Sequence, residues 1–143
     1  MNSSYDTAKR LVMWSALLIC VDGLVAVAMN PTDAGTSTLI SRAIDDIAND
    51  REAQVAANTL KNQSPEEVVP IVVATLRTDD RFRDRPARSY LFQILLANAR
   101  YTASLPLGRE QCLQGMRHGF ACPCATILGH VPAEDRAEVV RAF

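Results

Sequence analysis

The chain has 143 residues, enough for one ordinary domain, and its formal net charge is −1 at pH 7. Hydrophobic residues make up 48% of it and charged residues 22%, so the chain can bury a core and global disorder is excluded. The balanced charge also opposes a protein that binds nucleic acid or an anionic surface through a field of one sign.

The first predicted element is an apolar stretch at residues 11–29, directly after Lys9 and Arg10. A positive region, an apolar run and a small-x-small site are together typical of a secretory signal, and residues 26–28 read Ala-Val-Ala. The pattern therefore predicts a signal peptide or membrane anchor at residues 1–28. The protein would then be exported, to the periplasm or the extracellular space, or held at the membrane by residues 11–28.

Asp22 interrupts the apolar stretch and decides between cleavage and anchoring. A carboxylate in the middle of a membrane span costs about 2.5–3.5 kcal/mol, and the run before Asp22 is too short to cross a bilayer. This favours a cleaved signal, with Met29 as the new terminus, over a retained anchor. A third alternative is an N-terminal helix that packs inside a water-soluble domain.

The rest of the chain reads as helices, because no stretch alternates apolar and polar residues for long and no hairpin dipeptide occurs. We expect a polar linker at residues 29–36 and a helical domain at residues 37–143. The expected elements are a stretch at 37–62 with a kink or a short break at Asn49-Asp50, a helix that begins at Ser64-Pro65, a helix from Pro86 to about residue 101, and a less regular last third that ends in a helix from Pro132.

The helix from Ser64 has the clearest start signal in the chain. Ser64, Pro65 and Glu67 match a capping box with proline at the first helical position, in which the serine hydroxyl accepts from a backbone N–H and the glutamate reaches back. Valines and Leu76 at helical spacing predict its buried stripe. Pro70 removes a backbone hydrogen bond and should bend the first turns.

Residues 64–100 resemble one unit of a HEAT-type helical repeat. The features that carry the resemblance follow each other in the order of that repeat, and they are a proline in the first helix (Pro70), an apolar stripe (Val73, Leu76), an acidic turn (Asp79, Asp80), an apolar residue before an arginine (Phe82, Arg83) and a second helix. The resemblance implies stacked helix pairs that present a surface to a partner protein. The expected fold class is all-α, an N-terminal signal or anchor helix followed by a small stack of antiparallel helical hairpins, either HEAT-like or an irregular α-bundle.

Three cysteines cluster near the C-terminus, namely Cys112, Cys122 and Cys124. In an oxidising compartment Cys112 would pair with one of the other two, closing a loop of about ten residues and contributing roughly 2–3 kcal/mol. Two alternatives use the same atoms. Cys112, His118, Cys122 and Cys124 contain enough ligands for zinc or copper, although the spacing matches no standard zinc signature. Cys122 and Cys124 around Pro123 could instead act as a redox pair.

An arginine-rich turn between two expected helices is the candidate partner-binding surface. It contains Arg77, Arg81, Arg83, Arg85 and Arg88, interleaved with Asp79, Asp80 and Asp84. A solvated turn whose charges pair with one another is the simpler interpretation, and a docking surface for an acidic partner is the functional one.

No catalytic residue and no cofactor is predicted, because the chain contains neither a G-x-S-x-G nucleophile elbow nor a phosphate-binding glycine loop. Two hypotheses follow. The first is an exported, non-catalytic helical module that binds a partner protein through residues 64–100. The second is a small periplasmic thiol or metal protein that uses the C-terminal cysteines. Neither involves nucleic acid, and a membrane enters only through an uncleaved N-terminal segment.

Overall fold

The computed structural model describes residues 31–83 and 85–142, and these residues are helical with no strand among them. The expected all-α class is therefore confirmed. The helices, with two short 3₁₀ turns η1 and η2, are α2 (Pro31–Ala48), α3 (Ala53–Lys61), α4 (Pro65–Thr78), η1 (Asp80–Phe82), α5 (Arg85–Ala97), α6 (Ala99–Ser104), α7 (Pro106–Arg117), α8 (Ala121–Leu128), η2 (Ala133–Asp135) and α9 (Arg136–Ala142).

The predicted signal peptide or anchor lies outside the described residues. Within the described part of the chain, no helix is long and apolar enough to cross a membrane. Helix α2 begins at Pro31, so most of the segment expected to be a linker is helical and the first helix starts six residues before the expected Ser37. The chain divides into two compact units, residues 1–37 and 38–143, and the second is described below.

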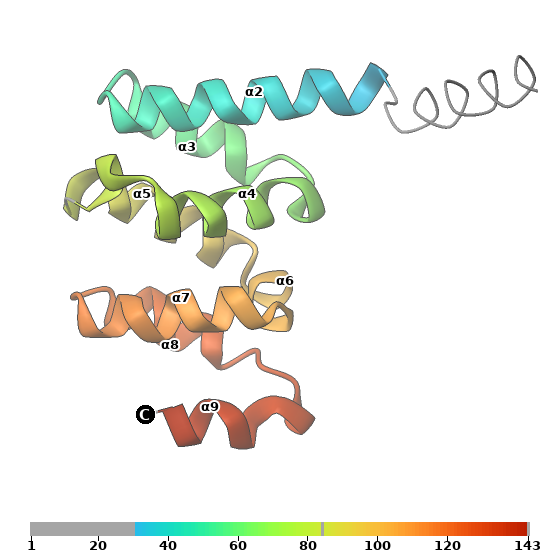
Figure 1. The fold of residues 1–143 in the computed structure, drawn as a ribbon, viewed down its shortest axis with the longest axis vertical. Helices are drawn as coiled ribbons and strands as arrows, with labels where there is room; N and C mark the ends of the chain where they lie inside the picture. The colour runs from blue at the N-terminus through green and yellow to red at the C-terminus, as the bar shows by residue number, and fades with distance from the viewer. Residues whose placement is uncertain (1–30, 84, 143) are drawn as a thin grey trace, which may run out of the picture. The chain divides into compact units, whose positions relative to one another are not determined.

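The second unit consists of helices in successive layers (Figure 1). Helices α4 and α5 run in opposite directions in one layer, and α7 and α8 do so in the next, with the short α6 between the layers. Helix α3 contacts α5, while α4 contacts α7 and α5 contacts α8. Each layer thus covers an apolar face of its neighbour.

One continuous core joins these layers, because each helix contributes apolar residues at helical spacing. Phe82 and Phe92 are its largest side chains and are almost fully buried. The remaining core residues with no measurable exposure are Ala57, Leu60, Val68, Val69, Val72, Leu91, Ile94, Leu95, Ala103, Cys112, Cys124 and Ile127.

The break between α2 and α3 confirms the one expected at Asn49-Asp50. Asp50 (φ 54°) and Glu52 (φ 46°) both adopt the left-handed conformation, which side chains other than glycine seldom take. The Asp45 carbonyl at the end of α2 accepts two hydrogen bonds from Asn49, one from its backbone N–H at 3.0 Å and one from its side-chain amide at 2.7 Å.

Helix α4 begins at Pro65 as predicted, but its cap differs from the expected box. The Ser64 side chain makes no bond to the backbone and instead donates to the Glu66 carboxylate at 2.5 Å. This hydrogen bond lowers the pKa of Glu66. The helix continues past Pro70, which is exposed to solvent.

Candidate functional site

The five arginines of the predicted partner-binding turn have different surroundings. Arg81 is occupied internally, because its guanidinium donates to Asp79 of the same turn at 2.7 Å and to Asp45 of α2 at 2.9 Å. Arg83 pairs with Asp80 at 2.7 Å, and both side chains of that pair are 77% exposed. Arg81 therefore holds the turn against α2, while Arg83 can exchange its partner for another anion.

Arg77 and Arg88 have no carboxylate partner among the described residues. Arg77 is exposed at the end of α4. The side chain of Arg85 lies outside the described part, although its backbone begins α5. Of the five predicted residues, the structure thus offers Arg77, Arg83 and Arg88 to a partner.

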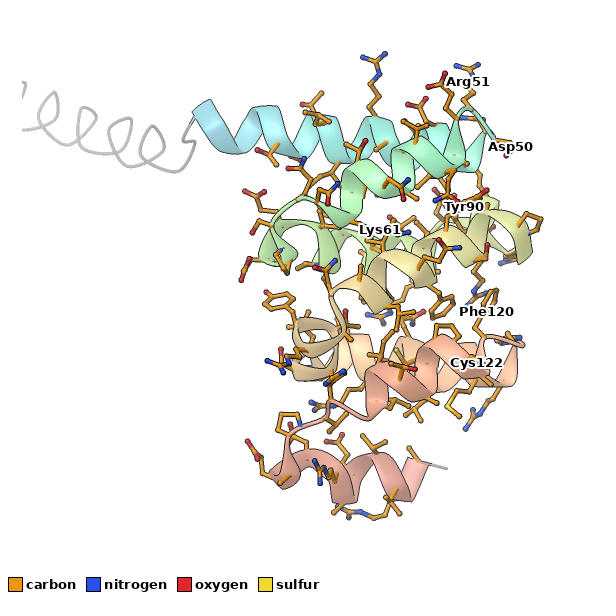
Figure 2. All side chains as sticks on the ribbon, turned by 180° about the vertical axis from the view of Figure 1, so that it is seen from behind. Asp50, Arg51, Lys61, Tyr90, Phe120 and Cys122 are labelled. Atoms are coloured by element: carbon orange, nitrogen blue, oxygen red, sulfur yellow. The ribbon has the colours of Figure 1, made fainter. Side chains whose placement is uncertain are left out.

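The Arg88 guanidinium lies over two aromatic rings. Its central carbon is 5.9 Å from the centre of the Phe92 ring and 6.0 Å from that of Phe120. The two rings stack on each other with 4.7 Å between centres and 23° between planes. Figure 2 shows Phe120 between the layers of α5 and α8. Cation–π attraction therefore fixes Arg88 in place, while its Nε atom is buried without a hydrogen-bond partner.

The end of α7 brings Arg117 and His118 to the same place. Helix α7 closes with a Schellman motif, in which the Phe120 N–H donates to the Gly115 carbonyl at 2.9 Å. Gly119 occupies the left-handed position of this motif with φ 92°, a value that favours glycine. The turn leaves Arg117 and His118 exposed on the surface next to Phe120.

Together these segments line a hollow of about 540 Å³, which we call the basic pocket. The residues around it are Arg83, Arg88, Met116, Arg117, His118, Gly119 and Phe120. None of them is acidic, so the positive charge of this hollow is uncompensated by its own lining.

A second hollow of about 310 Å³ adjoins the basic pocket and shares Arg83, Arg88 and His118 with it. Its lining adds oxygen acceptors to the cations, and these belong to Asp79, Asp80, Glu110, Gln111 and Gln114. The two hollows together present a half lined without acidic residues and a half lined by both basic and acidic residues.

The cysteines are free thiols in the structure, so the predicted disulfide is not formed there. Cys112 of α7 and Cys124 of α8 are buried and hydrogen-bonded to each other. That hydrogen bond, together with burial, raises the pKa of Cys112, and the same bond lowers the pKa of Cys124 with a smaller contribution from the Arg88 charge. Cys122 is exposed on α8 (Figure 2).

The structure does not gather the alternative metal ligands. His118 and Cys122 are exposed, whereas Cys112 and Cys124 are buried in the core. No cluster of three or more His, Cys, Asp or Glu residues suited to a metal ion occurs in residues 31–83 and 85–142.

Comparisons with known proteins find no match for this chain. The chain matches no family model, no curated protein and no solved structure.

Sequence reasoning missed the α7 half of the basic pocket. Arg117, His118 and Phe120 lie about thirty residues after Arg88, so local charge counting does not connect them. The available signal was Gly119, which marks the end of a helix, but this signal does not say which layer the end faces.

Proposed function

We propose that this protein is a non-catalytic helical interaction module, of HEAT-like type, that binds an anionic segment of a partner protein through the basic pocket. The observation that carries the proposal is the convergence of Arg88, Arg117 and His118 with Arg83 on one hollow that is lined by no carboxylate of residues 31–83 and 85–142. Arg88 and Arg117, which have no carboxylate partner among the described residues, repel one another in this hollow and gain energy when an anion enters.

The layered helices support the same proposal. Antiparallel pairs that contact the next pair are the arrangement implied by the HEAT-like sequence of residues 64–100, and such stacks present extended surfaces to partners. The pocket lies where two layers meet, between η1 and α5 on one side and the end of α7 on the other.

Export belongs to the proposal as well. It rests on the signal-like pattern of residues 1–28, where a positive region, an apolar run and Ala-Val-Ala follow one another. Sequencing the mature N-terminus of the protein from its host tests this part. A protein that starts at Met29 supports export with cleavage, and an uncleaved chain in the soluble cytosolic fraction contradicts it.

The thiol hypothesis is the weaker of the two. Cys112 and Cys124 have no exposed surface, and a thiol that reagents cannot reach is a poor nucleophile for exchange or redox chemistry. The accessible Cys122 stands apart from that pair on the surface of α8.

Fluorescence anisotropy with a labelled glutamate-rich peptide tests the binding proposal. We expect saturable binding that weakens as salt rises, and no binding of a lysine-rich peptide of the same length. Arg117→Glu should weaken the binding by at least about tenfold, equivalent to 1.4 kcal/mol. The matched control is Arg100→Glu, because Arg100 is exposed on α6 and lines neither hollow. Equal binding by both variants would reject the basic pocket.

A further inference from the structure

We infer that the group entering the basic pocket is a phosphomonoester, carried on the partner segment as a phosphorylated side chain. This inference rests on the proposed function and names the chemistry of the anion. It follows from the number of charges, their geometry and the shape of the neighbouring hollow.

The charge of the lining exceeds what one carboxylate neutralises. Arg88 and Arg117 carry permanent charges without a carboxylate partner in the described ranges, and Arg83 adds a third, shared with an exposed Asp80. A carboxylate would bring one negative charge. A phosphomonoester brings about −1.5 to −2 at neutral pH and three acceptor oxygens, which matches two unpaired guanidinium groups.

The geometry of Arg88 favours the same ligand. A guanidinium presents a planar fork of donors that fits two oxygens of a phosphate. Cation–π contacts to Phe92 and Phe120 favour that position of the fork before any ligand arrives. Ordering of a long side chain on binding costs free energy, and here the fold has already ordered it.

The adjoining hollow indicates that the phosphate is part of a longer segment. Its lining includes the Gln111 Oε1 atom, which is buried without a hydrogen-bond partner, and a phosphate ion held at the shared arginines would leave this acceptor unused. A donor from a residue flanking a phosphorylated side chain, such as a backbone N–H group, can occupy it. A phosphorylated protein segment therefore fits both hollows, whereas inorganic phosphate fits one.

The experiment compares three peptides of identical flanking sequence in which the central residue is phosphoserine, glutamate or serine. Isothermal titration with the full chain should show the phosphoserine peptide binding at least about tenfold more tightly than the glutamate peptide, a difference of 1.4 kcal/mol. Inorganic phosphate should compete only at much higher concentration than the phosphopeptide.

Two variants separate recognition from folding. Arg117→Gln changes an exposed side chain, leaves the core untouched and should abolish the preference for phosphoserine. Arg117→Lys keeps the charge but lacks the fork, so it should restore only part of that preference. Arg100→Gln is the matched control and should bind as the natural chain does.

The outcomes distinguish this inference from the proposed function. Equal affinity for the phosphoserine and glutamate peptides overturns the phosphomonoester and leaves the anionic partner segment standing. Binding of neither peptide overturns both. Inorganic phosphate as tight as the phosphopeptide, or vesicles containing phosphatidic acid that bind more tightly than the peptide, would assign the pocket to an ion or a membrane and also overturn the inference.

Discussion

Arg109 of α7 and Asp135 of η2 form an ion pair with 2.9 Å between Nη1 and Oδ2. The arginine side chain is only 8% exposed, and it also donates to the Ala103 carbonyl at 3.1 Å. The pair joins the segment just before α9 to α7. This link matters because Val139 is the one buried residue that α9 contributes to the core.

Removing Asp135 should therefore destabilise the C-terminal end of the fold. Asp135→Asn leaves a buried guanidinium without its counter-charge, and we expect a loss of about 1–2 kcal/mol, less than for a fully buried pair because Asp135 is partly exposed. Urea unfolding measures the loss. Glu138→Gln is the control, since Glu138 is 72% exposed and 3.7 Å from Arg109. Equal losses from both substitutions would contradict the role given to Asp135.

Gly115 should tolerate no side chain. A methyl group there would come within 2.6 Å of the Phe92 ring and 2.7 Å of the Cys124 sulfur. We expect Gly115→Ala to lower the free energy of unfolding by about 1–3 kcal/mol through overpacking, although alanine favours helix by up to about 1 kcal/mol. Gly35→Ala, in open space on α2, should be neutral or slightly stabilising. A stabilised Gly115→Ala protein would show that α7 and α8 are less closely packed than described.

The thiols should differ sharply in alkylation. Iodoacetamide should modify Cys122 in the folded protein and spare Cys112 and Cys124, because the reagent cannot reach these two buried thiols. Burial and hydrogen bonding also raise the pKa of Cys112 and so keep it protonated. Peptide mapping by mass spectrometry before and after denaturation locates the label. Labelling of Cys124 at the rate of Cys122 would contradict the burial. A mass lower by two hydrogen atoms, with Cys112 linked to Cys122 or Cys124 in the peptide map, would instead establish the disulfide expected from the sequence.

Asp79 should make the free energy of unfolding fall at acid pH. The hydrogen bond from Arg81 lowers the pKa of Asp79 below its ordinary value of 3.8. The stabilisation is therefore complete above that ordinary value and is lost as the pH falls through the lower, folded-state pKa. Unfolding of the natural chain and of Asp79→Asn, compared from about pH 2 to pH 6, should show curves that converge at the acid end.

Asp80→Asn is the matched control for that comparison. Asp80 pairs with Arg83 on the surface, so its substitution should change stability little across the same range. If the natural chain and Asp79→Asn still differ in free energy of unfolding at the lowest pH, the role assigned to the Arg81 hydrogen bond would be contradicted.

The helices were predictable because the spacing of their apolar residues and the residues that start and end them are local signals. Pro65 marked the start of α4, the Asn49-Asp50 pair marked the break before α3, and the valine stripe of α4 is buried as expected. The start of α2 was placed too late because the polar residues after Pro31 look like a linker, yet proline at the first turn of a helix is compatible with α2.

The candidate site was predictable only in part. Charge counting found the arginine turn but could not tell that Arg81 turns back to Asp79 and Asp45, or that Arg88 lies on Phe92 and Phe120. Both facts depend on how layers meet, which single-sequence periodicity does not encode. The sequence left open whether Cys122 or Cys124 faces Cys112, because the helical path of α8 decides which of the two is buried and which is exposed.

The succession of layers has a consequence for how the chain reaches its native state. Helices that touch are close neighbours along the sequence, as α7 with α8 or α4 with α5, and the longer contacts join adjacent layers. Little loop-closure entropy has to be overcome before such contacts form. We therefore expect residues 38–143 to have a low relative contact order and to refold on the microsecond-to-millisecond scale of local helical topologies, without a slow search for distant partners.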